Sequence, residues 1–343
     1  MNLSKGLSYQ FLSPDERSAY GITLECFGRL EKSFSFSHEN LNIDPMKIIQ
    51  AVLGDNPTVF YFKKNYIEII KSETTQTISL SDVIEKPEAQ KMIQQVEAEA
   101  SKIVAMIKAS VHKKNDPYTV LLKLYEYFQD NIQYGRENVH KSTDINIDYA
   151  LEHTAYGALI YKNAVCDGIA SAFNLLASKL GFRCMLAVGR SAYELSTTKN
   201  HAWTIIEIAN SFYHMDVTWD ICHSSDFGEY SYSYFALSDF EIENDHSWDR
   251  KVLPSCIDNS FSYHRKNDCY AENIQQASHI IQSAKKKVQG ETHLKLSNKL
   301  KLDINLGEKL AELYLEVMSE VYQEVRMKYI WEEHTRCFYA KLV

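Results

Sequence analysis

The sequence predicts a fold that mixes helices and strands, in which segments of helical periodicity are followed by a β-hairpin. Three observations support this prediction. Apolar residues recur at helical spacing over a long stretch, from 82 to 113. A second helical stripe runs through residues 161–181. Two runs rich in aromatic and β-branched residues, 201–208 and 212–219, follow it closely and are separated by a short turn.

The composition is that of an ordinary soluble globular protein. The chain has 343 residues, of which 45% are hydrophobic and 24% charged, so one large domain or two ordinary ones are expected. The net charge is −8 and the basic residues are scattered, which argues against nucleic acid as a partner. No apolar run reaches 18 residues, so we expect neither a transmembrane helix nor a membrane partner.

The seven cysteines do not form a recognisable framework. No C-x-x-C pair occurs, which argues against a zinc ribbon or a thioredoxin-type redox site, and the wide spacing does not suggest a set of disulfides. The first residues contain no uninterrupted apolar stretch after Lys5, so no secretory signal is expected. Together these features predict a reduced, cytoplasmic protein.

The first part of the chain is expected to contain helices and a strand region. Ser13 is followed by a proline, which is a typical helix start, and residues 14–32 continue with helical spacing. Residues 58–70 are rich in aromatic and β-branched side chains and predict one or two strands. Asp116 is also followed by a proline and opens the predicted helix 117–132.

The helix predicted within residues 161–181 carries the first chemical signal. Its apolar stripe begins at Ile169, and Gly181 stands where a helix-terminating glycine belongs. Cys166 lies three residues before the stripe, so it falls at or next to the helix N-terminus. The unpaired N–H groups and the positive dipole end there stabilise a thiolate and could hold an oxyanion. The alternative is a small buried core cysteine.

The strands that follow carry the second signal. A turn at residues 209–210 pairs Ile208 with Ser211, because Asn tolerates a left-handed conformation. This register makes His201 and Asp216 diagonal neighbours on one face, about 7–8 Å apart at the backbone. An imidazole and a carboxylate can meet across that distance. The carboxylate would fix the tautomer of the imidazole and stabilise its cation.

Other interpretations of the strand residues stay open at this point. A satisfied strand histidine is the alternative for His201, and His214 is a rival for its role because it pairs with Ile205 on the same face. Cys184 lies in the half-buried strand predicted over 182–190, so we interpret it as core packing. The joint arrangement is nevertheless distinctive. A nucleophile at a helix start, then a base and an orienting carboxylate, is what cysteine-based acyl transfer requires.

Several segments match motifs of one known family. They resemble the transglutaminase-like superfamily, in particular its bacterial cytosolic-type members, over about residues 50–265. One departure is Val217, where many relatives have proline. The matching segments are D-N-P-T-V-F-Y-F at 55–62, N-I-Q-Y at 131–134, H-T-A-Y at 153–156, V-C-D-G-I-A-S-A-F at 165–173, L-G-F at 180–182, H-A-W at 201–203, H-M-D-V-T-W-D at 214–220, Y-F-A-L-S-D-F at 234–240, D-H-S-W at 245–248 and P-S-C at 254–256.

The resemblance implies a papain-like α+β core in which the nucleophile helix packs on an antiparallel sheet, flanked by N- and C-terminal α/β extensions. It implies Cys166 as nucleophile, His201 as general base and acid, and Asp216 as the orienting group. H-A-W is the segment that matches the family's base, which favours His201 over His214. Calcium-dependent members use extra acidic sites, but no EF-hand-type loop occurs here, and we expect no cofactor.

On this basis the chain is divided into an N-terminal extension (1–114), a catalytic core (115–265) and a C-terminal extension (266–343). The predicted function is a thiol-dependent acyl-transfer enzyme that acts on amide bonds of peptides or proteins, with hydrolysis favoured. The alternatives are a protein cross-linking transglutaminase and a non-catalytic binding or scaffold protein of the same fold. The oligomeric state is left open.

Two aromatic residues are candidates for substrate contact beside Cys166, His201 and Asp216. Trp203 and Tyr156 are predicted to contact substrate, with sheet packing as the alternative for Trp203 and structural support as that for Tyr156 and His153. A metal site built from neighbouring His and Cys residues is a further alternative. Adjacent Cys and His lack the usual ligand spacing, so no metal is expected there. The residues of that candidate metal site are His214, Cys222, His223 and His246.

Overall fold

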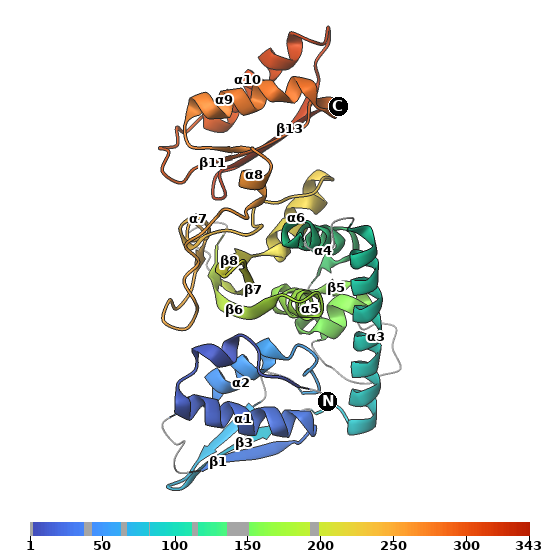
Figure 1. Cartoon of the computed structure of the whole chain (residues 1–343), viewed down its shortest axis with the longest axis vertical. Helices are drawn as coiled ribbons and strands as arrows, with labels where there is room; N and C mark the ends of the chain where they lie inside the picture. The colour runs from blue at the N-terminus through green and yellow to red at the C-terminus, as the bar shows by residue number, and fades with distance from the viewer. Residues whose placement is uncertain are drawn as a thin grey trace.

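The chain folds into three stacked parts, an arrangement that Figure 1 shows from the N-terminal part at the bottom to the C-terminal part at the top. The α+β class is confirmed, because helices pack on separate, mainly antiparallel sheets. Among the residues that the structure describes, no helix is both long and apolar enough to cross a bilayer. The computed structural model describes residues 3–37, 43–62, 67–81, 83–111, 116–135, 151–192 and 199–343.

The N-terminal part combines helices with a small antiparallel sheet whose strand order is β1-β3-β2. The predicted helix start at Ser13 is confirmed: its side chain accepts from the Glu16 N–H, and the Glu16 side chain accepts from the Ser13 N–H. The strand prediction for 58–70 is right only at its end, and residues 63–66 lie outside the described residues. The elements are η1 (Ser8–Phe11), α1 (Pro14–Gly28), β1 (Ser33–Ser37), α2 (Pro45–Asp55), β2 (Ile67–Lys71) and β3 (Thr75–Leu80).

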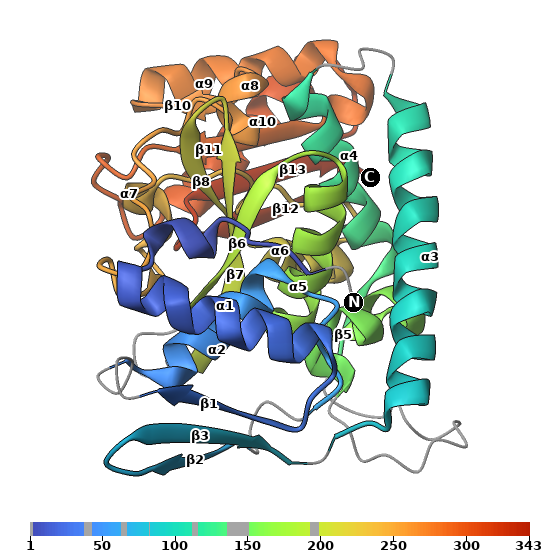
Figure 2. The same cartoon turned by 60° about the horizontal axis from the view of Figure 1, so that its bottom comes forward.

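A long helix, α3 (Lys86–Ser110), runs along one side of the molecule (Figure 2). It is shorter at both ends than the predicted 82–113, and residues 82, 112 and 113 lie outside the described residues. Its buried residues follow helical spacing and join the core that the N-terminal and central parts share. The helix therefore ties these two parts together.

The central part is a four-stranded antiparallel sheet, in the order β8-β7-β6-β9, with α5 packed on it. The helix opens at Cys166, and its buried face includes Phe173 and Leu176. The elements here are α4 (Pro117–Asn131), β4 (Gln133–Tyr134), η3 (Leu151–His153), η4 (Gly157–Tyr161), β5 (Asn163–Ala164), α5 (Cys166–Lys179), β6 (Arg183–Ser191), β7 (Lys199–Ile208), β8 (Ser211–Met215), α6 (Val217–Phe227), α7 (Asp239–Ile242), β9 (His246–Ser247) and α8 (Tyr263–Lys266).

The predicted hairpin register is confirmed as far as β8 extends. Ile208 pairs with Ser211 and Ile205 with His214, and the turn residues Ala209 and Asn210 both have positive φ. The prediction that the second strand continues to residue 219 is wrong, because β8 ends at Met215. The chain then turns into α6. The side chain at position 216 caps that helix, a role that competes with continuation of the strand.

The C-terminal part has its own hydrophobic core, formed by residues between 269 and 340. Helices α9 and α10 pack on a sheet in the order β10-β11-β13-β12 (Figure 2). The predicted domain boundaries stay predictions, and residues 114 and 115 at the first of them lie outside the described residues. The elements are β10 (Tyr270–Ala271), α9 (Ile274–Ser283), η5 (Ala284–Lys286), η6 (Val288–Gly290), β11 (Thr292–Leu296), α10 (Leu306–Ser319), β12 (Met327–Glu332) and β13 (Cys337–Leu342).

Candidate active site

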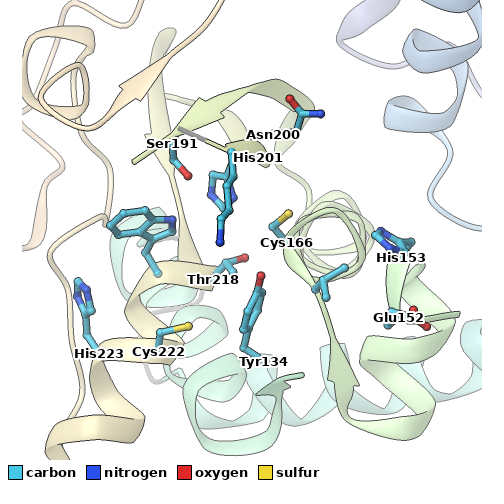
Figure 3. A pocket seen from close by; sticks show the side chains of 13 residues that line it. Tyr134, Glu152, His153, Cys166, Ser191, Asn200, His201, Thr218, Cys222 and His223 are labelled. Carbon is cyan, nitrogen blue, oxygen red and sulfur yellow. The ribbon is translucent and has the colours of Figure 1, made fainter. Parts of the chain in front are cut away.

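A cavity of about 560 Å³ opens where the start of α5 meets the sheet and the start of α6. Cys166 and His201 both line it, one from a helix and the other from a strand (Figure 3). The structure therefore brings together the residues predicted as nucleophile and base. Its walls also include Tyr134, Glu152, Lys199, Trp219, Cys222 and His223.

Cys166 is the first residue of α5, as the sequence predicts, and its side chain is half-buried. The first N–H groups of a helix have no partner within the helix, so this end can hold negative charge on a thiolate or an oxyanion. The helix start packs tightly against η3. A Cβ added at Gly168 would lie 2.2 Å from the Glu152 carbonyl oxygen, so only glycine fits there.

His201 lies on β7 and donates from Nε2 to Asp216 Oδ2 at 2.6 Å, with both side chains buried. The other ring nitrogen, Nδ1, is then the one available to Cys166. Burial by itself would lower the pKa of His201, but the Asp216 carboxylate and the Cys166 side chain raise it to about 10. The imidazole is therefore held in its cationic form beside the thiol.

Asp216 is fixed from several directions. Its Oδ1 accepts from the backbone N–H groups of Thr218 and Trp219 at the start of α6. Burial would raise the pKa of this carboxyl, yet the cationic His201 and His246 hold it well below its usual range. The predicted pair of His201 and Asp216 thus meets head to head, although Asp216 is a helix cap and not a strand residue.

A second histidine contacts the same oxygen of this carboxylate as His201. His246 places Nε2 3.0 Å from Asp216 Oδ2 and Nδ1 2.5 Å from Asp245 Oδ1. Tyr234 donates to the other oxygen of Asp245, also at 2.5 Å. These residues had no such role in the predictions, although D-H-S-W at 245–248 was among the segments that resemble the family.

Trp203 is fully buried and lies behind His201, not in the cavity wall. This corrects the expectation of a substrate contact. The indole stacks on His201, with ring centroids 5.9 Å apart and planes 17° apart. It donates from Nε1 to His214 Nδ1 at 2.9 Å, so His214 uses Nε2 to donate to Asp239. His214 therefore holds Trp203 in place, and the tryptophan that lines the cavity is Trp219.

Tyr156 is also absent from the cavity wall, which corrects the second expected substrate contact. It is buried against α3, and its hydroxyl donates to Gln95 Oε1 at 2.9 Å. His153 does line the cavity, where Nδ1 lies 2.7 Å from Oδ1 of Asp167, the residue that follows Cys166. His153 ends η3, whereas Tyr156 follows it, and the two side chains therefore lie in different places.

The residues of the candidate metal site have separate partners in the structure. His214 contacts Trp203 and Asp239, whereas His246 lies between Asp216 and Asp245. His223 Nδ1 lies 2.8 Å from Glu332 Oε1, and Cys222 lines the cavity beside it. These contacts do not form the four-ligand set considered from the sequence.

The other cysteines differ from Cys166 in their surroundings. Burial raises the pKa of the Cys184 thiol to about 12, in line with its predicted place in the core. Burial and the nearby Glu31 raise the pKa of the Cys26 thiol to about 12 as well. Cys222 shares the cavity with Cys166, but it lies within α6 and not at its N-terminus.

Comparison with known proteins finds one matching family. The transglutaminase-like superfamily model matches residues 105–217. No curated protein matches the chain. One solved structure, described as a TGase, is 16% identical with a TM-score of 0.29, and the match covers 44% of this chain and 43% of that one.

A second solved structure, from Cytophaga hutchinsonii and provisionally described as a cysteine protease, is 12% identical with a TM-score of 0.26. Its match covers 44% of this chain and 61% of that one. The chain therefore spans less than two thirds of either relative. The family match includes Cys166, His201 and Asp216, and it ends before Tyr234, Asp245 and His246. Residues 105–217 of this protein belong to the transglutaminase-like superfamily.

Proposed function

We propose that this protein is a thiol-dependent acyl-transfer enzyme that acts on amide bonds of peptides or proteins, and that hydrolysis is its main reaction. The observation that carries the proposal is the meeting of Cys166, at the start of α5, with the hydrogen-bonded pair of His201 and Asp216 in one cavity. A nucleophile, a base and an orienting carboxylate are the groups that such chemistry needs.

The first half of the reaction forms an acyl-enzyme. The Cys166 thiolate attacks the amide carbonyl carbon, and the carbonyl oxygen becomes an oxyanion next to the helix N-terminus. The His201 imidazolium then gives its proton to the nitrogen as the C–N bond breaks, and the amine leaves. Asp216 stabilises the imidazolium and keeps the ring oriented throughout.

The second half releases the acyl group. Neutral His201 takes a proton from water while the water oxygen attacks the thioester carbon. When the tetrahedral intermediate collapses, the C–S bond breaks and Cys166 is again a thiolate beside the imidazolium. Water needs no site of its own, which is why hydrolysis is favoured.

Transamidation is the second candidate, and one feature favours it. A cavity of about 700 Å³ adjoins the first and shares Tyr134 and Cys222 with it. Asp130 and Glu229 line this second cavity; Glu229 is paired with Lys341, so Asp130 is the carboxylate that would attract a protonated primary amine. An amine arriving there would replace water as the acceptor of the acyl group.

A non-catalytic binding protein of the same fold is the alternative from another class. It would not need a cationic His201 next to a half-buried thiol, whereas the proposed chemistry does. We infer a peptide or protein substrate because the two adjoining cavities form an extended cleft. Neither nucleic acid nor a membrane is proposed as a partner, and the free cysteines support a reducing, cytoplasmic location.

The test incubates the protein with a mixed peptide pool, with and without an added primary amine, and follows the products by mass spectrometry. Hydrolysis of backbone amides gives shorter peptides, deamidation adds about 1 Da to a peptide, and transamidation adds the amine with loss of ammonia. Cys166→Ala is the matched control. Products that depend on Cys166 support the enzyme, and identical peptide pools with both proteins would favour the scaffold.

A further inference from the structure

Behind Asp216, a buried series of hydrogen bonds continues through His246 and Asp245 to Tyr234. We propose that His246, held between Asp216 and Asp245, is a positioning residue that fixes Asp216 and limits how strongly this carboxylate stabilises the cation of His201. This inference rests on the proposed function, because it concerns the same nucleophile. It adds to the triad a second layer that residues 234–246 supply, beyond the segment that matches the family.

The hydrogen-bond geometry fixes the number of protons in this layer. Each ring nitrogen of His246 faces a carboxylate oxygen, at 3.0 Å for Asp216 and 2.5 Å for Asp245. A lone pair on either nitrogen would point at a lone pair on oxygen, so both contacts need a hydrogen. Two protons therefore lie between these three groups, and with both carboxylates ionised His246 is an imidazolium.

The surroundings favour that protonation state. Burial by itself would lower the pKa of His246, but the contacts with Asp216 and Asp245 raise it. Tyr234 donates to the other oxygen of Asp245. The groups that face His246 from neighbouring elements are His201, Trp203, Trp219, Tyr234 and His214. Among them, His214 is neutral, because burial lowers its pKa.

His246 and His201 compete for one oxygen atom. Both donate to Oδ2 of Asp216, at 3.0 and 2.6 Å, while Oδ1 is taken by the N–H groups that open α6. A cation at His246 draws part of the carboxylate's charge away from His201 and stabilises the ionised form of Asp216. The sharing of Asp216 Oδ2 between His201 and His246 thus sets how tightly His201 holds its proton.

Removal of the His246 cation should therefore strengthen the thiolate–imidazolium pair. The measured quantity is the pH at which the alkylation rate of Cys166 by iodoacetamide falls to half its plateau. In His246→Gln we expect this pH to move down by about one unit, because Asp216 then acts on His201 alone. A purely structural role for His246 would lower stability without moving this pH.

A double variant protects the test against misfolding. His246→Gln alone leaves Asp245 buried with a weaker partner, which is destabilising, whereas Asp245→Asn with His246→Gln removes both charges together. The double variant should show the same downward shift. His264→Gln is the matched control, since His264 is also a buried histidine, but its ring lies 4.0 Å from Cys337 and not at Asp216.

The outcomes separate the two proposals. A downward shift in both His246 variants and none in His264→Gln supports the role of His246. A half-rate pH equal to that of the wild type in both folded variants would overturn it, and so would a stoichiometric metal ion bound by the wild type and lost with His246. If wild-type Cys166 shows no enhanced reactivity, the proposed function itself fails.

Discussion

His201 Nε2 and Asp216 Oδ2 lie 2.6 Å apart, although one residue belongs to a strand and the other caps a helix. This contact leaves His201 Nδ1 for Cys166 on the cavity side. The sheet fixes the histidine, the start of α6 fixes the carboxylate, and α5 fixes the thiol. Three separate elements therefore determine the geometry of the triad.

The pH dependence of stability should reflect this contact. The pKa of His201 is raised to about 10 in the folded protein, against about 6.5 in an unfolded chain. A raised histidine pKa stabilises the fold fully below about pH 6.5, and this contribution is lost as the pH rises through about 10. Urea unfolding should therefore show a decline in stability over that range, on the order of a few kcal/mol. In His201→Gln this part of the decline should disappear, and parallel curves for the two proteins would contradict the assignment.

A methyl group added at the start of α5 should disturb the nucleophile. Gly168→Ala places Cβ 2.2 Å from the Glu152 carbonyl oxygen, so either η3 or the first turn of the helix must move. We expect a loss of about 2–3 kcal/mol in unfolding free energy and slower alkylation of Cys166. Gly21→Ala is the control, because nothing lies within 4 Å of its added Cβ in the middle of α1. It should leave stability unchanged or raise it by about 0.5–1 kcal/mol; equal effects of the two substitutions would argue against a tight contact at Gly168.

The buried carboxylate of Asp220 should make the Tyr125 hydroxyl important. Asp220 accepts from Tyr125 and from the N–H groups of Ser233 and Tyr234 in a fully buried site. Tyr125→Phe removes one donor and should cost about 1–3 kcal/mol in chemical unfolding. Tyr230→Phe removes the same group from an exposed site at Asp130 and should cost less than about 1 kcal/mol. The reverse order would show that burial of Asp220 does not govern its contacts.

Attachment of the C-terminal part should depend on Glu332. Glu332 lies on β12 and accepts hydrogen bonds from Ser233 Oγ and Thr335 Oγ1. Its Oε1 lies 2.8 Å from Nδ1 of His223, a residue that lines the cavity. Glu332→Ala should lower the unfolding free energy by about 1–3 kcal/mol and increase proteolysis near residue 266. The neighbouring Glu333 is exposed, so Glu333→Ala is the control and should change neither the unfolding free energy nor the proteolysis appreciably. Unchanged proteolysis in Glu332→Ala would mean that the contact does not hold the two parts together.

The sequence could predict local features of the site because short-range rules govern them. The hairpin pairs Ile208 with Ser211, as a two-residue turn at Asn210 requires, and Cys166 begins the helix whose stripe starts at Ile169. The end of β8 could not be read in the same way. Val217 and Thr218 are typical strand residues, but Asp216 caps a helix there, and local hydrogen bonding prevailed over strand propensity.

The residues around the triad depend on tertiary packing and were less predictable. From the sequence, Trp203 could contact substrate or pack against the sheet. In the structure it packs against the sheet, because Gly189, which pairs with His201, has no side chain and leaves room for the indole. The contacts of His246 with Asp216 and Asp245 could not be predicted from local sequence rules either. Residues 191 and 246 pair only because the short β9 returns to the edge of β6, far along the chain.

The most direct test compares Cys166 with Cys222, since both line the same cavity and only Cys166 begins a helix next to His201. The protein is treated with limiting iodoacetamide at about pH 6, and modified cysteines are located by mass spectrometry. We predict that Cys166 is modified at least about tenfold faster than Cys222 and that His201→Gln removes most of this difference. Equal rates for the two cysteines, or a rate at Cys166 that His201→Gln leaves unchanged, would contradict an activated nucleophile at Cys166.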